Sequence, residues 1–270
     1  MSRRLLAIRP GGVGDCILCF PAIESLRNRC EYLEVWTPRA VTPLVYFADR
    51  VRAISDTGLD LFGLEGLAPN ARLIETLRNF DAIVSWYGTN RADFRSAAEA
   101  LSLPIEFHIA LPPQDSQVHA CDFFCAQLGA PPGATPRIPT ISQKRHFFAI
   151  HPFSGSPRKN WPLDRFDAVA RAVGIPVEWC TTSEQATELG SRTPLLAVDD
   201  LAQVAYWLSE ALVYLGNDSG ITHLAAAVGT PVIALFGGAS DPKIWAPRGD
   251  SVRIITGASM DAIGVDAVVA

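Results

Sequence analysis

Short apolar runs alternate with longer amphipathic stretches along this chain. In the first half the runs that predict strands are "LLAIRP", "LEVWTP", "VRAIS", "DAIVSW" and "EFHIA". Helical periodicity between them predicts helices over residues 17–29, 72–79 and 115–128. Strands that alternate with helices in this way are typical of parallel sheets with crossover connections, so we expect an α/β fold.

A proline- and glycine-rich stretch, "GAPPGATPRIPTISQ", interrupts the alternation between Gly129 and Gln143. Its composition is that of a domain linker. We therefore expect two domains, over residues 1–140 and 141–270. Each is expected to be Rossmann-like, and the two to face one another across a cleft where ligands bind.

After this linker the alternation restarts. Strands are expected at "FFAIHP", "PVEWC", "LLAVD", "ALVYLGN", "PVIALFGG" and "VRIIT". Helices are expected over residues 163–172, 184–189, 201–209 and 221–228. A closing helix near residues 260–269 is a candidate to pack back on the amino-terminal domain.

Composition places the chain among globular proteins. It has 270 residues, 49% of them hydrophobic, and a formal charge of −5 with both signs interspersed. No basic tract that would indicate a nucleic-acid-binding surface is present in the sequence. The first apolar run is too short for an export signal and no apolar stretch is long enough to span a bilayer, so we expect a cytoplasmic protein. The spacing of the six cysteines favours buried, reduced thiols.

The first strand leads into the glycine-rich turn "RPGGVGDC". Gly12 and Gly14 fill the first two places of a dinucleotide fingerprint, but Ile17 stands in the third and no acidic residue follows the next strand, which disfavours an NAD site. The turn places Asp15 at a helix amino terminus, where the helix dipole favours a carboxylate. Two interpretations stay open, a proton acceptor beside a ligand and a simple helix cap.

A second turn, "FSGSPRKNWPLDRF", follows the strand "FFAIHP". Ser154, Gly155 and Ser156 form a small loop rich in N–H groups, and Lys159 adds a point charge, a combination suited to phosphate. The alternative is a solvated basic turn.

A third turn lies in "YLGNDSGITHLAAAVGTPVIALFGGA", where Ser219 and Gly220 open a helix. Its unpaired N–H groups admit an anion, and Asp218 is a candidate cap. His223 either donates to a phosphate oxygen or satisfies a hydrogen bond in the core.

Three segments together resemble glycosyltransferase family 9, the ADP-heptose:lipopolysaccharide heptosyltransferases. They are "IRPGGVGDCILCFPAIESLR", "HPFSGSPRKNWPLDRFDAVA" and "LGNDSGITHLAAAVGTPVIALFGGASDPKIWAPRG". The resemblance implies a GT-B fold with an amino-terminal acceptor domain and a carboxyl-terminal nucleotide-sugar domain.

The resemblance also implies roles for particular residues. Asp15 takes the place of the general base, and Lys159 contacts the phosphate region of the donor. Asp218, Ser219, Gly220 and His223 hold the pyrophosphate and the sugar. Glu184 and the turn at residues 198–200 are placed near ribose and adenine. Beside these implied roles, we expect Gly12, Gly14 and Arg91 on the acceptor side of the cleft.

The expected reaction is a single displacement with inversion, without metal or other cofactor, because Asp199 and Asp200 are adjacent and form no metal-binding DxD pair. The resemblance implies that the sugar is a heptose or a related sugar from an ADP-type donor, and that the acceptor is a saccharide or glycolipid such as the lipopolysaccharide inner core. Peripheral contact with the inner membrane face stays open.

In the loops "GLDLFGLEGLAPN" and "YGTNRADFRS" the only close basic pair is Arg91 and Arg95, so no long basic acceptor surface is expected there. The alternatives to a glycosyltransferase are a nucleotide-sugar-binding module without transfer activity and, as the third choice, an NAD-dependent oxidoreductase.

Overall fold

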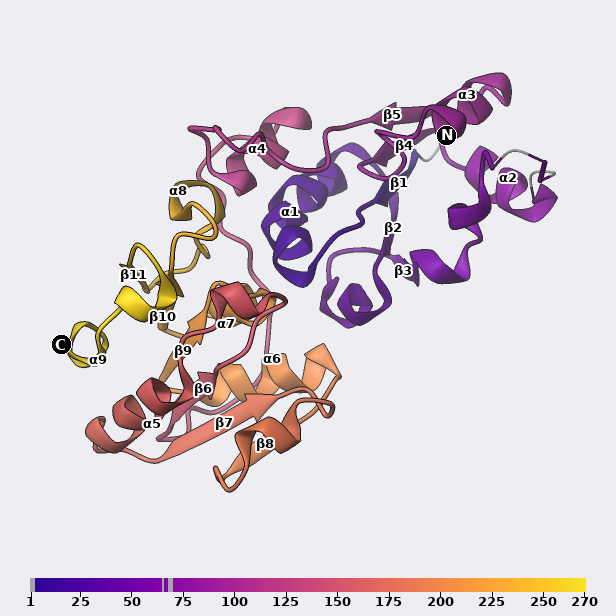
Figure 1. Cartoon of the computed structure of the whole chain (residues 1–270). Coiled ribbons are helices and arrows are strands. Elements are labelled where there is room, and N and C mark those ends of the chain that lie inside the picture. Colours follow the sequence, from indigo (N-terminus) through magenta and orange to yellow (C-terminus); the bar gives the residue numbers. More distant parts are fainter. Residues whose placement is uncertain (1–2, 65, 68–69) are drawn as a thin grey trace. The chain divides into compact units, whose positions relative to one another are not determined.

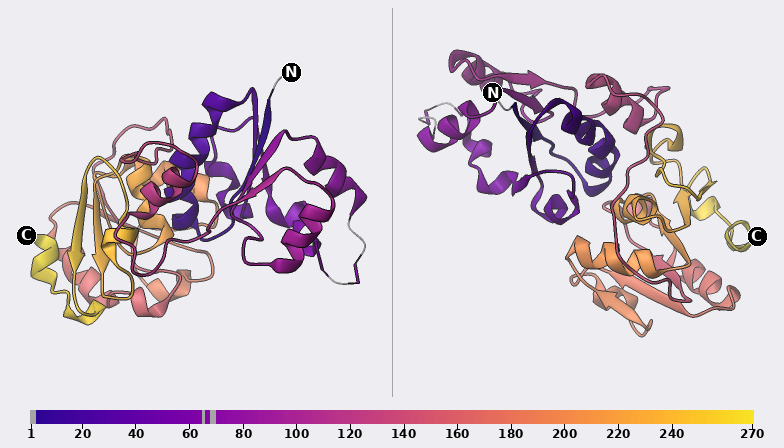
Figure 2. Two further views of the ribbon diagram at one scale, coloured as in Figure 1. Left: turned by 90° about the horizontal axis from the view of Figure 1, so that it is seen from above. Right: turned by 180° about the vertical axis from the view of Figure 1, so that it is seen from behind.

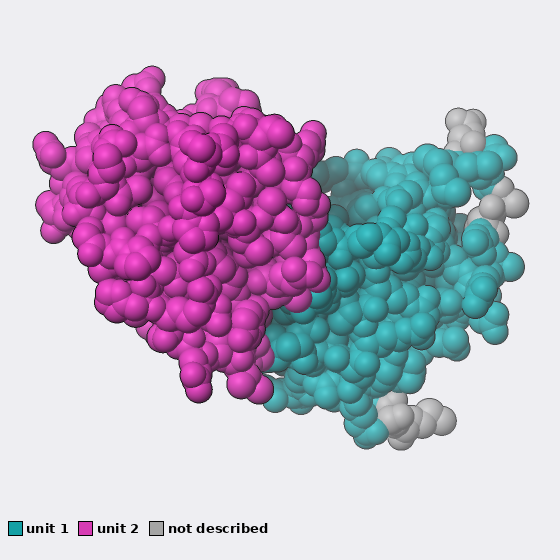
Figure 3. Space-filling model, turned by 90° about the horizontal axis from the view of Figure 1, so that it is seen from below, with its two compact units in different colours: residues 1–12, 19–115, 120–134 teal, residues 13–18, 116–119, 135–270 magenta. Residues whose placement is uncertain are grey.

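The computed structural model describes residues 3–64, 66–67 and 70–270. The chain divides into two compact units, shown in different colours in Figure 3. Unit 1 consists of residues 1–12, 19–115 and 120–134, and unit 2 of residues 13–18, 116–119 and 135–270. Each unit has its own parallel sheet and its own hydrophobic core.

Unit 1 is built on a parallel sheet with the strand order β3-β2-β1-β4-β5 (Figure 1). The strands are β1 (Arg4–Ile8), β2 (Tyr32–Thr37), β3 (Arg50–Ala53), β4 (Ala82–Ser85) and β5 (Ile105–Phe107). The winding reverses between β1 and β4. In such sheets ligands bind outside the carboxyl ends of the strands at the reversal, which is where the glycine turn after β1 begins.

The helices and short 3-10 turns of the first half connect these strands. They are α1 (Val13–Ser25), η1 (Leu26–Arg29), η2 (Arg39–Leu44), η3 (Ile54–Asp56), η4 (Leu59–Leu61), α2 (Ala71–Arg78), α3 (Ala92–Ala100) and α4 (Ala120–Gln127). Alternate strand residues such as Leu6, Ile8 and Trp36 face one core, which Phe62 and Phe94 fill from the connections.

Unit 2 contains a larger parallel sheet in the order β11-β10-β9-β6-β7-β8. Its strands are β6 (Phe148–His151), β7 (Val177–Thr181), β8 (Leu195–Ala197), β9 (Val213–Asn217), β10 (Val232–Phe236) and β11 (Val252–Thr256). Figure 2 shows β10 and β11 running side by side, in orange and yellow. The winding reverses between β6 and β9, so the turns after these two strands meet at the predicted ligand position of the unit.

The helices of unit 2 pack in pairs. They are α5 (Leu163–Ala172), α6 (Leu201–Glu210), α7 (Gly220–Ala227), α8 (Pro242–Trp245) and α9 (Val265–Val269), with short turns η5 (Pro157–Lys159), η6 (Ala186–Leu189) and η7 (Met260–Ala262). The closing helix α9 packs against α5, and α6 packs against α7. Alternation along the strands sends one set of side chains, including Ile150 and Leu215, toward the core that contains Phe166 of α5 and Val268 of α9.

The alternating α/β pattern is confirmed, with every expected strand present. Two short helices, α3 and α8, escaped the sequence analysis. The segment "YGTNRADFRS", expected to be a loop, enters α3, because Phe94 and Ala98 are one helical turn apart and both are buried. Of the other loop considered there, residues 65, 68 and 69 lie outside the described residues.

All six cysteines are free thiols, and all except the partly exposed Cys30 are buried. No helix among the described residues has the length and apolar character needed to cross a membrane.

Candidate active site

The turn between β6 and α5 is fixed by Asn217, a fully buried residue at the end of β9. The side-chain Nδ2 of Asn217 donates to Pro152 O (2.6 Å), and its side-chain Oδ1 accepts from Trp161 N (3.0 Å). Within the turn, Ser154 Oγ lies 2.7 Å from Asn160 Oδ1. One buried amide therefore fixes both ends of the loop that carries Ser154, Gly155, Ser156 and Lys159.

Lys159 and Asp218 form an ion pair across the two turns at the strand reversal. Lys159 Nζ donates to Asp218 Oδ2 at 2.6 Å, and the Asp218 side chain is 8% exposed. The Ser240 hydroxyl donates to the same carboxylate oxygen. An ammonium has three donors, so two N–H groups of Lys159 make no hydrogen bond to the described residues.

Ser219 is the N-cap of helix α7, and its hydroxyl caps the helix by accepting from Thr222 N at 3.4 Å. Asp218, expected as a candidate cap, is paired with Lys159 instead. A Cβ atom on Gly220 would lie 2.6 Å from Cβ of Val13, so glycine is needed for the first turns of α1 and α7 to approach within unit 2.

His223 lies one turn into α7 and is 5% exposed. Burial lowers its pKa to about 4, while the nearby carboxylates of Asp218 and Asp15 act in the opposite direction. His119 and Lys159 act in the same direction as burial. Its ring is therefore neutral near neutral pH, and among the described residues its buried Nδ1 atom has no hydrogen-bond partner.

Asp15 lies in the first turn of α1, in the part of that helix that belongs to unit 2, and is partly buried. Gly14 beside it packs on His223, because a Cβ atom there would lie 2.7 Å from Cδ2 of the imidazole. Asp15, the next residue, is near enough for its charge to oppose the lowering of the His223 pKa. Unit 2 thus brings Asp15 together with Lys159, Asp218 and His223.

The turns after β7 and β8 lie at the same edge of the sheet of unit 2. Glu184 is exposed in the first of them. A backbone hydrogen bond from Ser183 N to Asp199 Oδ1 (3.1 Å) ties this turn to the second, where Asp200 caps α6 by accepting from Ala202 N (2.8 Å). The two segments that sequence analysis placed near ribose and adenine are therefore connected.

The remaining candidates belong to unit 1. Gly12 is exposed in the turn after β1. Arg91 is engaged in local structure, donating to Phe62 O (3.2 Å) and to Asp93 Oδ2 (2.9 Å) at the start of α3.

Two residues of the unit 2 cluster, Ser240 and His119, escaped the sequence analysis as site residues. Asn217 lies in the third turn that the sequence analysis considered, but its role in fixing the turn after β6 was not predicted. Ser240 orients the Asp218 carboxylate. His119, from the short segment at residues 116–119 that folds with unit 2, lies with its Nε2 atom 2.9 Å from Ala246 O and influences His223. His119 is distant in sequence from the turns that form the cluster, and no local sequence pattern predicts that it joins them.

Histidine burial in unit 2 predicts a pH-dependent stability. Burial lowers the pKa of His151, at the end of β6, to about 4, against an ordinary value of 6.5. Between pH 6.5 and pH 4 the histidine binds a proton in the unfolded chain but not in the folded chain. The free energy of unfolding is therefore unaffected by this residue above pH 6.5 and decreases as the pH drops toward 4. The loss is on the order of 3 kcal/mol for this residue.

Urea unfolding across that pH range measures the slope, which His151→Asn should reduce but not abolish, because the similarly lowered pKa of His223 still contributes. The exposed His146 offers a matched control, and His146→Asn should leave the slope unchanged. A wild-type slope in His151→Asn would contradict the assignment.

The arrangement has the chemistry of a phosphate site with an adjacent base. Lys159, the N–H groups of the β6 turn and the start of α7 supply donors, and Asp15 and Asp218 supply acceptors. Among the described residues no group of three or more histidine, cysteine, aspartate or glutamate side chains is arranged to hold a metal ion.

Comparison with known proteins gives consistent matches. The sequence model of glycosyltransferase family 9 (heptosyltransferase) matches residues 108–264, more than half of the chain. A stretch of 130 residues is 28% identical to lipopolysaccharide heptosyltransferase 3 of Escherichia coli (strain K12). That match covers 43% of this chain and 37% of the relative, so it spans little more than a third of that protein's length.

Two solved structures from E. coli are similar over nearly the whole chain. ADP-heptose lps heptosyltransferase II has a TM-score of 0.74 at 17% identity, covering 98% of this chain and 96% of its own. Heptosyltransferase WaaC with ADP-2-deoxy-2-fluoro heptose has a TM-score of 0.67 at 19% identity, covering 98% and 97%. At such identities the likeness shows the fold, which is GT-B with two Rossmann-like domains. Together with the family match over residues 108–264, it establishes that this chain belongs to glycosyltransferase family 9.

Proposed function

We propose that this chain is an inverting glycosyltransferase that moves a heptose, or a related sugar, from an ADP-type donor to a saccharide acceptor. The observation that supports it best is the cluster in unit 2, where Lys159, Asp218, His223 and Asp15 are gathered at the strand reversal. The family match and the ADP-sugar bound to a solved structure of similar fold favour this donor class.

The donor diphosphate binds at the turns after β6 and β9. Lys159 offers two N–H groups that its pairing with Asp218 leaves available, and the loop at residues 154–156 offers backbone N–H groups. His223, being neutral, has a single N–H donor. The second carboxylate oxygen of Asp218 accepts no hydrogen bond from the described residues, and we expect it to accept one from a hydroxyl of the sugar. Glu184 and the turn at residues 198–200 extend the site toward ribose and adenine.

Asp15 acts as the general base. Its carboxylate takes the proton of an acceptor hydroxyl, and the hydroxyl oxygen forms a bond to the anomeric carbon as the bond from that carbon to the phosphate oxygen breaks. The electron pair leaves with the ADP diphosphate, and because attack comes from the opposite face, the anomeric configuration inverts. Lys159 and the N–H groups stabilise the charge that develops on the leaving phosphate.

We propose that the reaction needs no metal ion or other cofactor, since a lysine and oriented N–H groups supply positive charge at the leaving group. Gly12, Gly14 and Arg91 stay candidates for the acceptor side. The acceptor is a saccharide or glycolipid, for which the lipopolysaccharide inner core is the first choice. We place the protein in the cytoplasm, with peripheral contact at the inner membrane face, which cell fractionation with a salt wash would check.

The test joins binding with turnover. Calorimetric titration with ADP, UDP, GDP and NAD should show preference for ADP. Release of ADP from ADP-heptose should depend on an added saccharide acceptor and persist after treatment with a chelator.

A different experimental result would contradict each part of the proposal. Preference for NAD would favour the oxidoreductase alternative. Tight binding of ADP-heptose with no turnover over a panel of acceptors would leave a nucleotide-sugar-binding module, and loss of turnover with the chelator would contradict metal independence.

A further inference from the structure

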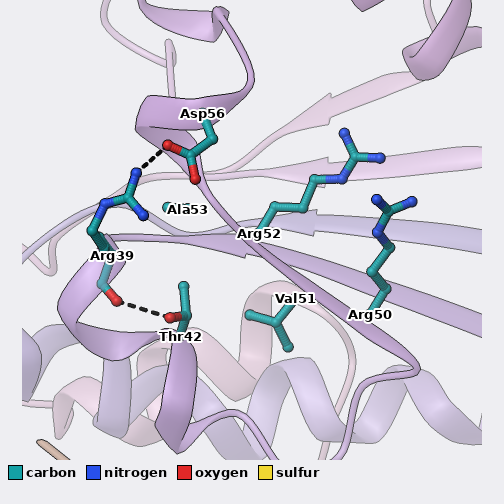
Figure 4. A pocket seen from close by; sticks show the side chains of 7 residues that line it. All are labelled: Arg39, Thr42, Arg50, Val51, Arg52, Ala53 and Asp56. Atoms are coloured by element: carbon teal, nitrogen blue, oxygen red, sulfur yellow. Dashed lines mark hydrogen bonds and ion pairs between the residues drawn. The ribbon is translucent and has the colours of Figure 1, made fainter. Parts of the chain in front are cut away.

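A cavity of about 420 Å³ opens along β3, the edge strand of the sheet in unit 1 (Figure 4). Its lining is dominated by charge. The residues that line it are Arg39, Thr42, Arg50, Val51, Arg52, Ala53 and Asp56. Arg50 and Arg52 are two apart on the strand, so both side chains project from the same face, as Figure 4 shows.

The positive charges of the arginines around this cavity are not all neutralised by ion pairs with carboxylates. Arg39 pairs with Asp56, and both side chains are largely exposed. Arg52 Nε lies 2.9 Å from Oε1 of Glu34 on the neighbouring strand β2. Arg50 has no ion pair with any of the described residues. Three guanidinium groups thus share two carboxylates, which leaves the cavity with a net positive charge.

Glu34 is a buried acceptor that contacts one of the three guanidinium nitrogens of Arg52. It is 2% exposed and accepts hydrogen bonds from Tyr32 Oη (2.9 Å) and Trp36 Nε1 (2.8 Å), whereas its contact with Arg52 is an ion pair in which Arg52 Nε makes no hydrogen bond to the described residues. The contact with Arg52 is made through Nε, and no hydrogen bond of its two terminal nitrogens is found among the described residues. Those nitrogens are the fork with which a guanidinium binds an oxyanion in a bidentate manner.

We propose that this cavity binds a phosphate group, through Arg50 and the terminal nitrogens of Arg52. A phosphate monoester carries nearly two negative charges near neutral pH, enough to compensate Arg50 and the excess charge beside Arg52. The cavity suits a small anionic group, and the net charge of −5 argues against a polyanion such as nucleic acid. The inference concerns unit 1 alone and does not depend on the proposed function.

The competing explanation is that these arginines only protect the edge strand, since charged side chains on an edge discourage pairing with another chain. That role requires charge and no ligand. It predicts that phosphate shifts the resonances of all exposed arginines weakly and equally.

The experiment is an NMR titration of the full chain that follows the arginine Nε–Hε signals at constant ionic strength. Inorganic phosphate and glucose 1-phosphate are the probes, with glucose as the uncharged reference. The signals of Arg50 and Arg52 should shift and saturate with both phosphates and not with glucose. Tighter binding of glucose 1-phosphate would point to a phosphorylated saccharide, and equal binding to free phosphate.

Arg50→Gln should weaken both phosphates about tenfold, because it removes a charged donor that has no structural partner. Arg72→Gln removes an exposed charge of α2 outside the cavity and should leave the affinity unchanged. Arg52→Lys keeps the charge but loses the fork, so it should weaken binding while sparing the pairing with Glu34. Equal effects of Arg50→Gln and Arg72→Gln, or no saturable shift at Arg50 and Arg52, would overturn the proposal.

Discussion

Replacing Asp15 by asparagine should lower kcat by about two to four orders of magnitude, the usual contribution of a general base. The amide keeps the size of the side chain and its place in the first turn of α1 but cannot accept the proton. The affinity for the donor should change little, because the phosphate contacts are made by other residues. Initial rates of ADP release over a range of acceptor concentrations, together with ADP titration, measure both quantities.

The alternative role of Asp15 as a simple helix cap has a matched control in the same unit. Asp164 lies in the first turn of α5 and is exposed, so Asp164→Asn removes the same charge from a helix amino terminus. Its cost should be limited to about 0.3–1 kcal/mol of stability, with kcat unchanged. If Asp15→Asn loses only a comparable amount of stability and retains its turnover, Asp15 is a cap and the proposed mechanism fails.

Replacing Lys159 by methionine should lower kcat/KM by roughly two to three orders of magnitude and weaken ADP binding as well. The ammonium is the charge proposed to meet the diphosphate, both in the bound donor and as charge develops on the leaving group. Methionine keeps much of the apolar stem without the charge. Steady-state kinetics and ADP titration report the two effects.

Arg158 provides the control for Lys159, since it is the preceding residue, is exposed and forms no ion pair with any of the described residues. Arg158→Met should keep nearly full activity and affinity. Lys159→Met also leaves Asp218 without its cationic partner, so thermal unfolding with and without ADP must accompany the kinetics. A folded Lys159→Met protein with wild-type affinity for ADP would remove the lysine from the site.

The local chemistry of the site was largely predictable from the sequence. Glycines after an apolar strand predicted a tight turn into a helix, and Asp15 is in the first turn of α1. Small residues followed by Lys159 predicted a compact loop. The candidate cap of α7 was identified less well, because a carboxylate and a hydroxyl are adjacent there and only the pairing of Asp218 with Lys159 leaves the cap to Ser219.

The relations between distant segments were harder to predict. Asn217 fixes a turn whose contacted residues, Pro152 and Trp161, precede it by 65 and 56 positions. The basic cavity joins Arg39 to Arg50 and Arg52, whereas the loops considered from the sequence contain only Arg91 and Arg95 as a close basic pair. Backbone register brings the first set together at an edge strand, and no sequence spacing encodes that register.

The sequence by itself determined the alternation of strands and helices, the small polar turns at strand ends and the residue types able to bind phosphate, because periodicity and turn chemistry are local properties. Only the tertiary structure decided the order of the strands, and with it the meeting of Lys159 with Asp218 and the inclusion of Asp15 and His119 in one cluster around His223. Those relations depend on which strands become neighbours, and that choice is made by packing across the whole sheet.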